Sequence, residues 1–338
     1  MERPHRQTDG GVWRKIALRP VRVISDLSVS PWPDQRAVVT IGAYDGVHLG
    51  HRAVIRQVRE RAEELGALSV VVTFDRHPAS VVRPDSAPRL LTTPEQKIEL
   101  LSQTGVDVVV VVPFSAEQAK ETPVDFVTRV LVNALRVQAV IVGSDFHFGH
   151  MRQGNITLLR EMGERHDFTC EPIVLVPRAD GVNEPVSSTA IRRALAGGEI
   201  DSATRMLGRA HEVRGVVIEG DQRGRTIGFP TANVNIPSGM CLPADGVYAG
   251  IYRRPDGTEH LCAINLGRRP TFYANQDYSL LEAYLLDFTG DLYGEEAAVQ
   301  FVAFLRSEKQ FGGLDELQEQ LVKDIDSARA AVLARRSN

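Results

Sequence analysis

The sequence has few cysteines, no long apolar run and no excess of positive charge. Its three cysteines, Cys170, Cys241 and Cys262, are far apart, so they form neither a zinc motif nor a redox pair, and they favour a reducing cytoplasm. No apolar run approaches the roughly 18 residues that a membrane span needs. The net charge of −4 lacks the basic balance of a nucleic-acid-binding protein. These absences predict a cytoplasmic protein without a membrane or nucleic-acid partner.

The chain also lacks the Walker sequence G-x-x-x-x-G-K-[ST], so any phosphate must be bound in another way. What is present is an ordinary globular composition, with 43% hydrophobic and 24% charged residues. A length of 338 residues suits two domains better than one core.

Short apolar runs rich in valine and isoleucine alternate with helical patterns in the first half. The expected strands are 38–41, 69–74, 106–113, 139–142 and 171–176, and the expected helices lie near 52–65, 94–104, 123–135 and 156–166. Buried strands separated by helices predict an α/β, Rossmann-like parallel sheet with helices on both faces. Such sheets bind ligands beyond the carboxyl ends of their strands.

The pattern changes near Gly197, between expected helices at 188–195 and 200–207. The later runs alternate with period two between glycine- and proline-rich turns, and they lie at 213–218, 246–253, 261–266, 280–288 and 297–306. This pattern predicts a small antiparallel β-barrel, against which an amphipathic helix at 314–334 would pack. We expect domains at 21–206 and 207–338, and a disordered extension at 1–11.

The segment TIGAYDGVHLGH, residues 40–51, joins an apolar strand, a glycine turn and the start of a helix. The free N–H groups and the dipole at a helix start favour an anion. His48 and His51 share one helix face and can donate to the same phosphate. Two alternatives stay open: these histidines could bind zinc together with His77, or they could be capping or core residues.

Two more polar segments, VTFDRHP (72–78) and VGSDFHFGH (142–150), follow expected strand ends, and a third, VSSTAIRRAL (186–195), stands at the start of an expected helix. In the first, Asp75 could contact a ligand or form an Asx-turn. In the second, Asp145 could hold Mg²⁺ on a triphosphate, whereas Phe148 could be a core residue. In the third, one hydroxyl would cap the helix, and the other hydroxyls with Arg192 suit a triphosphate.

The barrel half contains GDQRGRTIGFPTAN, residues 220–233. Pro230 favours an extended Phe229, so Thr231 and Asn233 project to the same side. A hydroxyl and an amide oxygen suit Mg²⁺ bound with ATP. A glycine and proline turn followed by a strand, with no ligand, fits the same residues.

Glu282 lies in an alternating strand on one face with Leu280, Tyr284 and Leu286. A carboxylate among apolar neighbours loses hydration and becomes more basic, which suits a general base. The alternative is that this face opens to solvent at one end of the barrel.

H-x-G-H followed by SSTAIR resembles the nucleotidyltransferases, and the full set with VTFDRHP and GSDFHFG resembles the FMN adenylyltransferase module of bacterial FAD synthetases. The resemblance implies that His48, His51 and Arg192 act on the ATP phosphates. Tyr44 and Arg76 stand where the family usually has Phe and Pro. The other nucleotide-binding positions that the resemblance implies are Gly42, Tyr44, Asp45, Asp75, His77, Asp145, Ser187, Ser188 and Thr189, with Asp145 also a Mg²⁺ ligand.

GFPTAN, LPADGVYAG, the Glu282 strand and DLYG resemble the riboflavin kinase barrel. The resemblance implies that Thr231 and Asn233 hold Mg²⁺ with ATP and that Glu282 deprotonates the riboflavin 5′-hydroxyl. The binding positions that it implies are Gly224, Arg225, Gly228, Phe229 and Pro230.

The two resemblances together predict a bifunctional riboflavin kinase and FAD synthetase. Its substrates would be ATP, riboflavin and FMN, its cofactor Mg²⁺, and its state a monomer or weak homo-oligomer. Two other functions remain open. The first domain could adenylylate a different phosphate acceptor, or the barrel could bind flavin only as a sensor.

Overall fold

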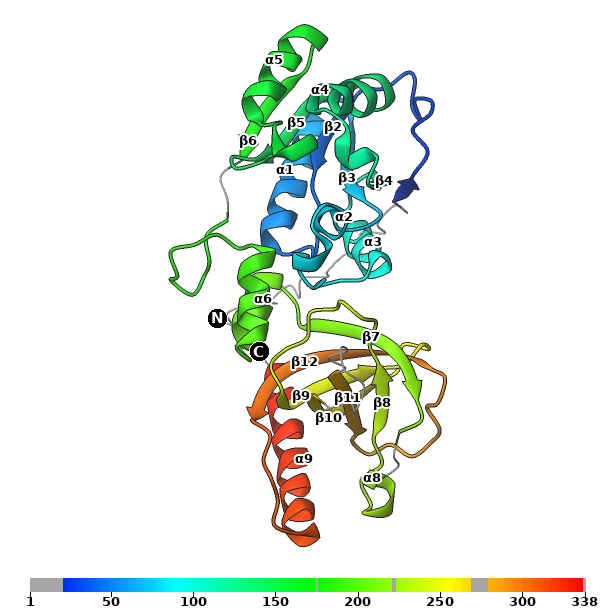
Figure 1. Cartoon of the computed structure of the whole chain (residues 1–338), viewed down its shortest axis with the longest axis vertical. Coiled ribbons are helices and arrows are strands. Elements are labelled where there is room, and N and C mark those ends of the chain that lie inside the picture. The colour runs from blue at the N-terminus through cyan, green and yellow to red at the C-terminus, as the bar shows by residue number, and fades with distance from the viewer. Residues whose placement is uncertain (1–20, 174–175, 221–222, 269–278, 337–338) are drawn as a thin grey trace, which may run out of the picture.

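The computed structural model describes residues 21–173, 176–220, 223–268 and 279–336, so the expected extension at 1–11 lies outside the described residues. The chain folds into a sheet with helices, followed by a barrel flanked by a long helix (Figure 1). We call these parts the sheet domain and the barrel domain. Among the described residues, no helix has the length and apolar character needed to cross a bilayer.

Six parallel strands form the sheet, in the order β1-β4-β3-β2-β5-β6. Their bounds are β1 (Arg22–Ile24), β2 (Ala37–Ile41), β3 (Leu68–Phe74), β4 (Val108–Val112), β5 (Val137–Gly143) and β6 (Thr169–Ile173). All five residues of β2 are buried, as expected for a central strand covered on both faces. Because β3 and β5 flank β2 on opposite sides, the chain direction across the sheet switches at the carboxyl ends of β2 and β5, where ligands bind in such sheets.

Helices cover both faces of the sheet, which confirms the predicted architecture. They are α1 (Leu49–Leu65), α2 (Pro78–Val82), α3 (Pro94–Ser102), α4 (Pro123–Phe126), the π-helical segment η3 (Val127–Ala134) and α5 (Ile156–His166), with short 3₁₀ turns η1 (Pro84–Ser86), η2 (Gln118–Lys120) and η4 (His150–Arg152). Val39 packs with Leu131 and Leu159 on one face. Val38 packs with α1 on the other face, where Val71 packs with α1 and α3.

The structure of this half differs in detail from the expected elements at three places. The helix expected at 123–135 is α-helical for one turn only and then π-helical, so the Leu135 amide donates to the Val130 carbonyl at 2.9 Å. The last strand was expected at 171–176, but it begins two residues earlier and pairs with β5 over Thr169–Ile173, whereas 174 and 175 lie outside the described residues. The short edge strand β1, which pairs with β4, was not predicted.

The barrel is closed and antiparallel, in the order β10-β11-β8-β7-β12-β9, which confirms the second predicted architecture. Its strands are β7 (His211–Ile218), β8 (Ala232–Asn235), β9 (Gly246–Arg253), β10 (Glu259–Arg268), β11 (Ser279–Leu285) and β12 (Glu296–Arg306). The single turn α8 (Arg223–Thr226) precedes β8. The last helix, α9 (Leu314–Arg336), buries Ala328 and Val332 against Ala249 and Val302 of the barrel wall.

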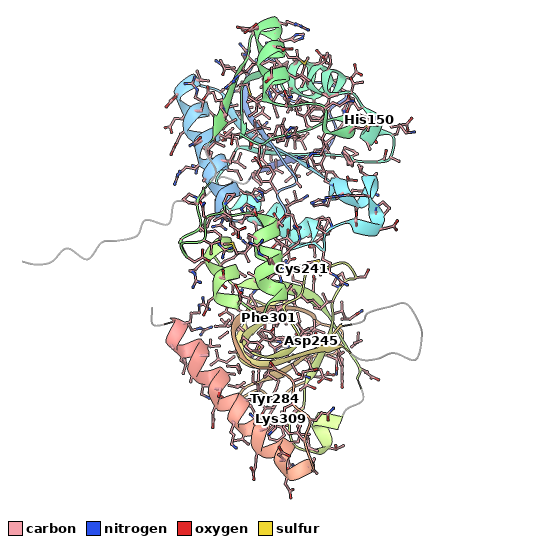
Figure 2. All side chains as sticks on the ribbon, turned by 60° about the vertical axis from the view of Figure 1, so that its left-hand side comes forward. His150, Cys241, Asp245, Tyr284, Phe301 and Lys309 are labelled. Carbon is pink, nitrogen blue, oxygen red and sulfur yellow. The ribbon has the colours of Figure 1, made fainter. Side chains whose placement is uncertain are left out.

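The two domains are joined by α6 (Ser188–Ala196) and α7 (Ile200–Leu207), whose apolar side chains share a core with the barrel. A second connection is made by the loop that contains Leu90. Its amide donates to the Gly239 carbonyl, and its carbonyl accepts from the Cys241 amide, both at 2.7 Å. Figure 2 places Cys241 at the level where the sheet domain meets the barrel.

Candidate active sites

The turn after β2 has an unusual backbone. Tyr44, Gly46 and Val47 all have positive φ, at 52°, 83° and 38°. Non-glycine residues rarely adopt this conformation, and where they do the surrounding contacts must hold it. We call residues 44–48 the histidine turn, because it ends at His48, directly before the first residue of α1.

His48 is the N-cap of α1, and the two predicted histidines lie together. The Nδ1 atom of His48 accepts from the His51 amide at 3.3 Å, and the two rings stack with centroids 3.6 Å apart. A ring that accepts at Nδ1 is neutral and carries its proton on Nε2, where it can donate to a ligand. Burial, followed by the charges of Arg209 and Arg192, lowers the pKa of His48 to about 3. Burial and the neighbouring His48 lower the pKa of His51 as well.

Tyr44 lies next to the ring of His51, and Gly42 lies next to the ring of Tyr44. Tyr44 is buried, its hydroxyl forms a 2.8 Å hydrogen bond with Thr40, and burial raises its pKa. Its ring centroid lies 4.9 Å from that of His51. A Cβ on Gly42 would lie 3.1 Å from the Tyr44 ring, so glycine allows the strand end and this ring to approach closely.

Asp45 and Arg192, which are far apart in the sequence, form an ion pair. Asp45 is buried and also accepts from the amides of Leu91 and Thr92, at 3.0 and 3.2 Å. The Nε of Arg192 donates to the Arg89 carbonyl at 2.6 Å. The contacts of Asp45 and Arg192 therefore connect the histidine turn to the start of α6 and to the loop that contacts the barrel domain.

Asp45→Asn is expected to destabilise the sheet domain by about 3 kcal/mol, because it leaves a largely buried guanidinium without its counter-charge. The measurement is urea unfolding followed by the fluorescence of Trp32, which is buried in this domain. The exposed Asp85→Asn is the matched control and should change the free energy of unfolding by less than about 0.5 kcal/mol. Equal stability of both variants would contradict a structural role for the pair.

The three predicted hydroxyl residues before α6 have different surroundings. Ser187 is the N-cap, since its side chain accepts from the Ala190 amide at 3.2 Å. Ser188 donates to the Asp45 carbonyl at 2.9 Å, whereas Thr189 is exposed. The hydroxyl segment thus lies against the histidine turn, as a shared nucleotide site requires.

Asp75 and His77 lie beyond the end of β3 and also make local contacts. Asp75 accepts from the Phe114 amide at 2.9 Å and lies 3.4 Å from the Arg76 guanidinium. His77 caps α2 by accepting from the Ala79 amide at 3.1 Å, and burial lowers its pKa.

Asp145 is exposed beyond β5, and Phe148 belongs to the core. Within the described ranges, His, Cys, Asp and Glu side chains form no group of three that could hold a metal ion. The zinc alternative therefore has no ligand set there.

Two basic residues at this site were not predicted. Lys97 of α3 is buried and donates to the Phe74 carbonyl at 2.6 Å; burial lowers its pKa, while Asp45 and Asp75 oppose that shift. Lys97 lies four residues before Leu101, on the same buried face of α3, and this spacing in the sequence could have predicted that Lys97 is buried. Arg209 donates to the Gly46 carbonyl at 2.8 Å, and no motif marks it in the sequence.

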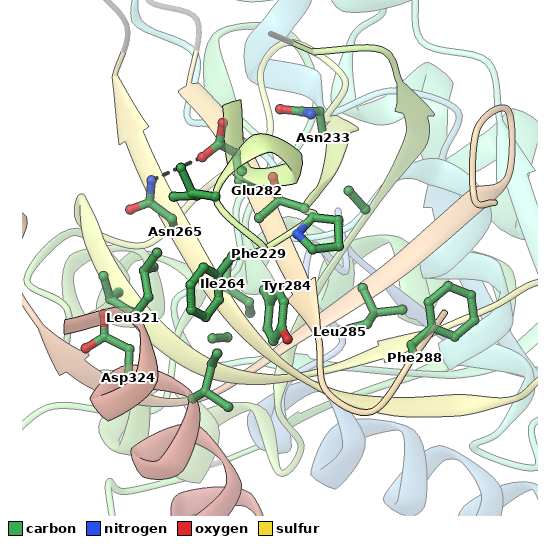
Figure 3. Close-up of a pocket in the computed structure, with 18 of the residues that line it drawn as sticks. Phe229, Asn233, Ile264, Asn265, Glu282, Tyr284, Leu285, Phe288, Leu321 and Asp324 are labelled. Carbon is green, nitrogen blue, oxygen red and sulfur yellow. Dashed lines mark hydrogen bonds between the residues drawn. The ribbon is translucent and has the colours of Figure 1, made fainter. Parts of the chain in front are cut away.

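The barrel domain has a cavity of about 1310 Å³ between its strands, α9 and the loop before β8. Pairing of β8 with β11 and of β11 with β10 aligns Asn233, Glu282 and Asn265 in one row. The Asn265 amide donates to the Glu282 carboxylate at 3.5 Å, as the dashed line in Figure 3 marks. Leu321 and Asp324 of α9 line the opposite wall.

Close packing shapes the loop before β8. A Cβ on Gly220 would lie 2.3 Å from the side-chain amide nitrogen of Asn233, and a Cβ on Gly224 would lie 2.3 Å from the backbone carbonyl oxygen of Phe229, so neither position has room for a larger residue. Gly228 has a φ of +89°. The predicted binding residues that line the cavity are Gly224, Phe229, Pro230, Thr231 and Asn233, while the side chain of Arg225 lies outside the described part of the structure.

Glu282 is half-buried and faces the cavity, whereas its neighbours Leu281 and Ala283 face the barrel core and have no exposed surface. Tyr284 shares its side of β11 and lies 5.8 Å from the Phe229 ring, centroid to centroid. Leu286, expected on the same face, lies beyond the strand end. The carboxylate therefore stands at the wall of a partly apolar cavity.

Known proteins resemble both halves. A family model described as FAD synthetase matches residues 30–190, and one described as riboflavin kinase matches residues 207–332. Relatives named bifunctional riboflavin kinase/FMN adenylyltransferase include proteins of Listeria monocytogenes (38% identical, covering 93% of this chain and 98% of the relative) and Pseudomonas fluorescens (40% identical, covering 88% and 94%). That of Escherichia coli is 37% identical over 92% of this chain and 97% of its own.

A solved structure also shares the two-domain fold. The crystal structure titled macrolide-efflux protein from Streptococcus pneumoniae superposes with a TM-score of 0.80 at 27% identity, covering 91% of this chain and 99% of that one. The FAD synthetase match falls on the sheet with its histidine turn, and the riboflavin kinase match falls on the barrel with its Asn233–Glu282 row. The chain belongs to the family of bifunctional riboflavin kinase/FMN adenylyltransferases.

Proposed function

We propose that the barrel domain, residues 207–338, phosphorylates riboflavin with ATP and that the sheet domain, residues 21–206, adenylylates the resulting FMN to give FAD and pyrophosphate. The observation that carries this proposal is the presence of two separate polar sites in one chain. One is the stacked histidine pair at the switch point of the sheet, and the other is the aligned row in the barrel cavity.

In adenylyl transfer, an FMN phosphate oxygen attacks the α-phosphorus of ATP, and the bond to pyrophosphate breaks. The residues need only position the phosphates and stabilise the developing charge. The Nε2–H of His48, the ring of His51 and the free amides at the start of α1 would do so. Ser187, Ser188, Thr189 and Arg192 would bind the triphosphate beside them. Gly42, Tyr44 and Asp45 would shape the turn, and Asp75 and His77 would line the neighbouring strand end.

In riboflavin phosphorylation, Glu282 would take the proton of the 5′-hydroxyl while that oxygen attacks the γ-phosphorus and ADP leaves. The Asn265 amide beside it would orient the carboxylate. The loop that contains Gly224, Arg225, Gly228, Phe229 and Pro230 would cover the nucleotide.

Both reactions would use Mg²⁺ that arrives with ATP. Thr231 and Asn233 offer a hydroxyl and an amide oxygen, and Asp145 offers an exposed carboxylate. Such sparse oxygen donors fit an ion that keeps phosphate oxygens and waters as its other ligands. Bound Mg²⁺ would neutralise phosphate charge.

We infer a cytoplasmic location from the thiols. All three cysteines are free, as is usual in the reducing cytoplasm, and burial raises the pKa values of Cys170 and Cys241 to about 11 and that of Cys262 as well. We propose that the protein is a monomer or a weak homo-oligomer and that its partners are ATP and flavins. Light scattering of the purified protein would test the oligomeric state.

The stability of the sheet domain is expected to fall at acid pH because of His48. The pKa of this group is 6.5 in its ordinary state and about 3 in the folded chain. The unfolded chain therefore binds more protons between these values, and the free energy of unfolding decreases as the pH falls through that window. From pH 7 to pH 5, His48 accounts for about 2 kcal/mol of the decrease.

The test compares urea unfolding at the two pH values in the wild type and in His48→Asn. Asparagine keeps a cap acceptor but does not titrate. The variant should lose about 2 kcal/mol less than the wild type over this range. Equal losses in both proteins would show that His48 is not held neutral.

The proposed function is tested by chromatography of flavins after incubation with ATP and Mg²⁺. Riboflavin should give FMN and then FAD, and FMN alone should give FAD. Nicotinate mononucleotide and pantetheine phosphate are offered in parallel, and adenylylation of either instead of FMN would support the alternative acceptor. Tight flavin binding without turnover would support the sensor alternative.

A further inference from the structure

Arg209 connects the barrel domain to the histidine turn. It follows Gly208, which caps the end of α7, and it precedes β7, whose first residue is His211. Its Nη2 donates to the Gly46 carbonyl at 2.8 Å, and its Nη1 lies 3.5 Å from the carbonyls of both Val47 and Leu207. A half-buried guanidinium from the start of the barrel domain thus reaches across to the histidine turn.

These contacts fall where the backbone needs support. Gly46 and Val47 have positive φ, and their carbonyls are the ones that Arg209 binds. The other sides of the turn are held from the sheet domain and α6, because the Gly46 amide donates to Thr92 at 3.2 Å and Ser188 donates to the Asp45 carbonyl at 2.9 Å. A strained conformation persists only where its surroundings hold it, so Arg209 completes the support of this turn.

The charge of Arg209 also acts on the histidine pair. After burial, it is the largest influence that lowers the pKa of His48, and it contributes with burial and His48 to the lowered pKa of His51. The other groups around the pair are Tyr44 from the turn and Arg192 from α6 with its partner Asp45, while the charge of Arg52 from α1 acts on Arg209 itself. The surroundings of the pair are mainly cationic, which favours neutral rings, and only a neutral His48 can cap α1 through Nδ1.

We propose that Arg209 is a positioning residue for adenylyl transfer, which holds the histidine turn so that His48 and His51 face the nucleotide. The inference rests on the proposed function of the sheet domain. It has two consequences. The carbonyl contacts of Arg209 fix the turn and thereby affect the rate of adenylyl transfer. The charge of Arg209 opposes protonation of the two rings and thereby determines the pH at which the activity falls on the acid side.

Two substitutions in the full chain separate these consequences. Arg209→Gln keeps a hydrogen-bond donor but removes the charge, and Arg209→Lys keeps the charge but cannot reach two carbonyls with a planar fork. Both should lower kcat/KM for FAD formation from FMN by roughly 10- to 100-fold, the effect of losing a charged hydrogen bond. The acid limb of the pH profile should move to higher pH in the glutamine variant and stay in place in the lysine variant.

Riboflavin phosphorylation by the same samples is the internal control for folding and should not change. Arg205→Gln, at an exposed arginine of α7, is the matched control and should equal the wild type in both reactions. Wild-type FAD formation with an unmoved acid limb in Arg209→Gln would overturn the inference. So would equal loss of both activities in Arg209→Lys, which would mark a general folding role. If the wild type itself makes no FAD from FMN, the proposed function fails instead.

Discussion

Glu282→Gln is expected to lower kcat for riboflavin phosphorylation by about 100- to 10,000-fold, the usual range for removing a general base. Glutamine keeps the size of the side chain and an oxygen that can accept from Asn265, 3.5 Å away in the wild type. It cannot take a proton. The KM for riboflavin should change little, because the cavity of about 1310 Å³ keeps its other lining residues. The measurement is initial-rate FMN formation from riboflavin with saturating ATP and Mg²⁺.

The matched control is Glu296→Gln, an exposed carboxylate at the start of β12. It should phosphorylate riboflavin at the wild-type rate. FAD formation from supplied FMN should be unchanged in both variants, since the histidine pair belongs to the other domain. A Glu282→Gln protein that keeps more than a tenth of the wild-type kcat would show that another group removes the proton.

His51→Ala is expected to lower FAD formation from FMN by about 100- to 1000-fold, as for the loss of one preorganised donor to a developing charge. His51 is the better choice of the pair, because the cap of α1 uses the ring of His48 and only the backbone amide of His51. The substitution therefore removes the ring that stacks at 3.6 Å while leaving the helix start intact. The measurement is the rate of FAD and pyrophosphate release with FMN and ATP.

His166→Ala, at the exposed end of α5, is the control for the general effect of removing a histidine and should be fully active. Riboflavin phosphorylation by His51→Ala should match the wild type. Wild-type FAD formation by His51→Ala would remove the ring from the proposed mechanism and leave the helix start alone as the phosphate site.

Local patterns were sufficient to predict both architectures. The buried runs of β2, β3 and β4 have few polar residues because helices cover both faces of the sheet, and the alternation in β7 has one face in the barrel core. Strands with little pattern were missed or left undecided. β1 has only three residues, and β8 has four, of which two are asparagines. The π-helical segment η3 has the apolar spacing of a helix, so its wider turn could not be distinguished from an α-helix in the sequence.

The candidate sites were predictable where motifs mark them and not where distant segments meet. The spacing of His48 and His51 indicated a shared helix face, and the structure stacks their rings. The sequence did not show that Asp45 pairs with Arg192, because that contact depends on how α6 packs against the turn. Arg209 lies in a connection with no periodic pattern, so only the packing of the two domains reveals its contact with Gly46.

The assignment of two separate sites is tested by following the conversion of riboflavin with ATP and Mg²⁺ over time in His51→Ala, in Glu282→Gln and in an equal mixture of the two. His51→Ala should stop at FMN, and Glu282→Gln should leave riboflavin unchanged but convert supplied FMN to FAD. The mixture should make FAD from riboflavin, because FMN released by one variant is a substrate for the other. Loss of both activities in either folded variant, or a mixture that makes no FAD, would contradict two separate sites in this chain.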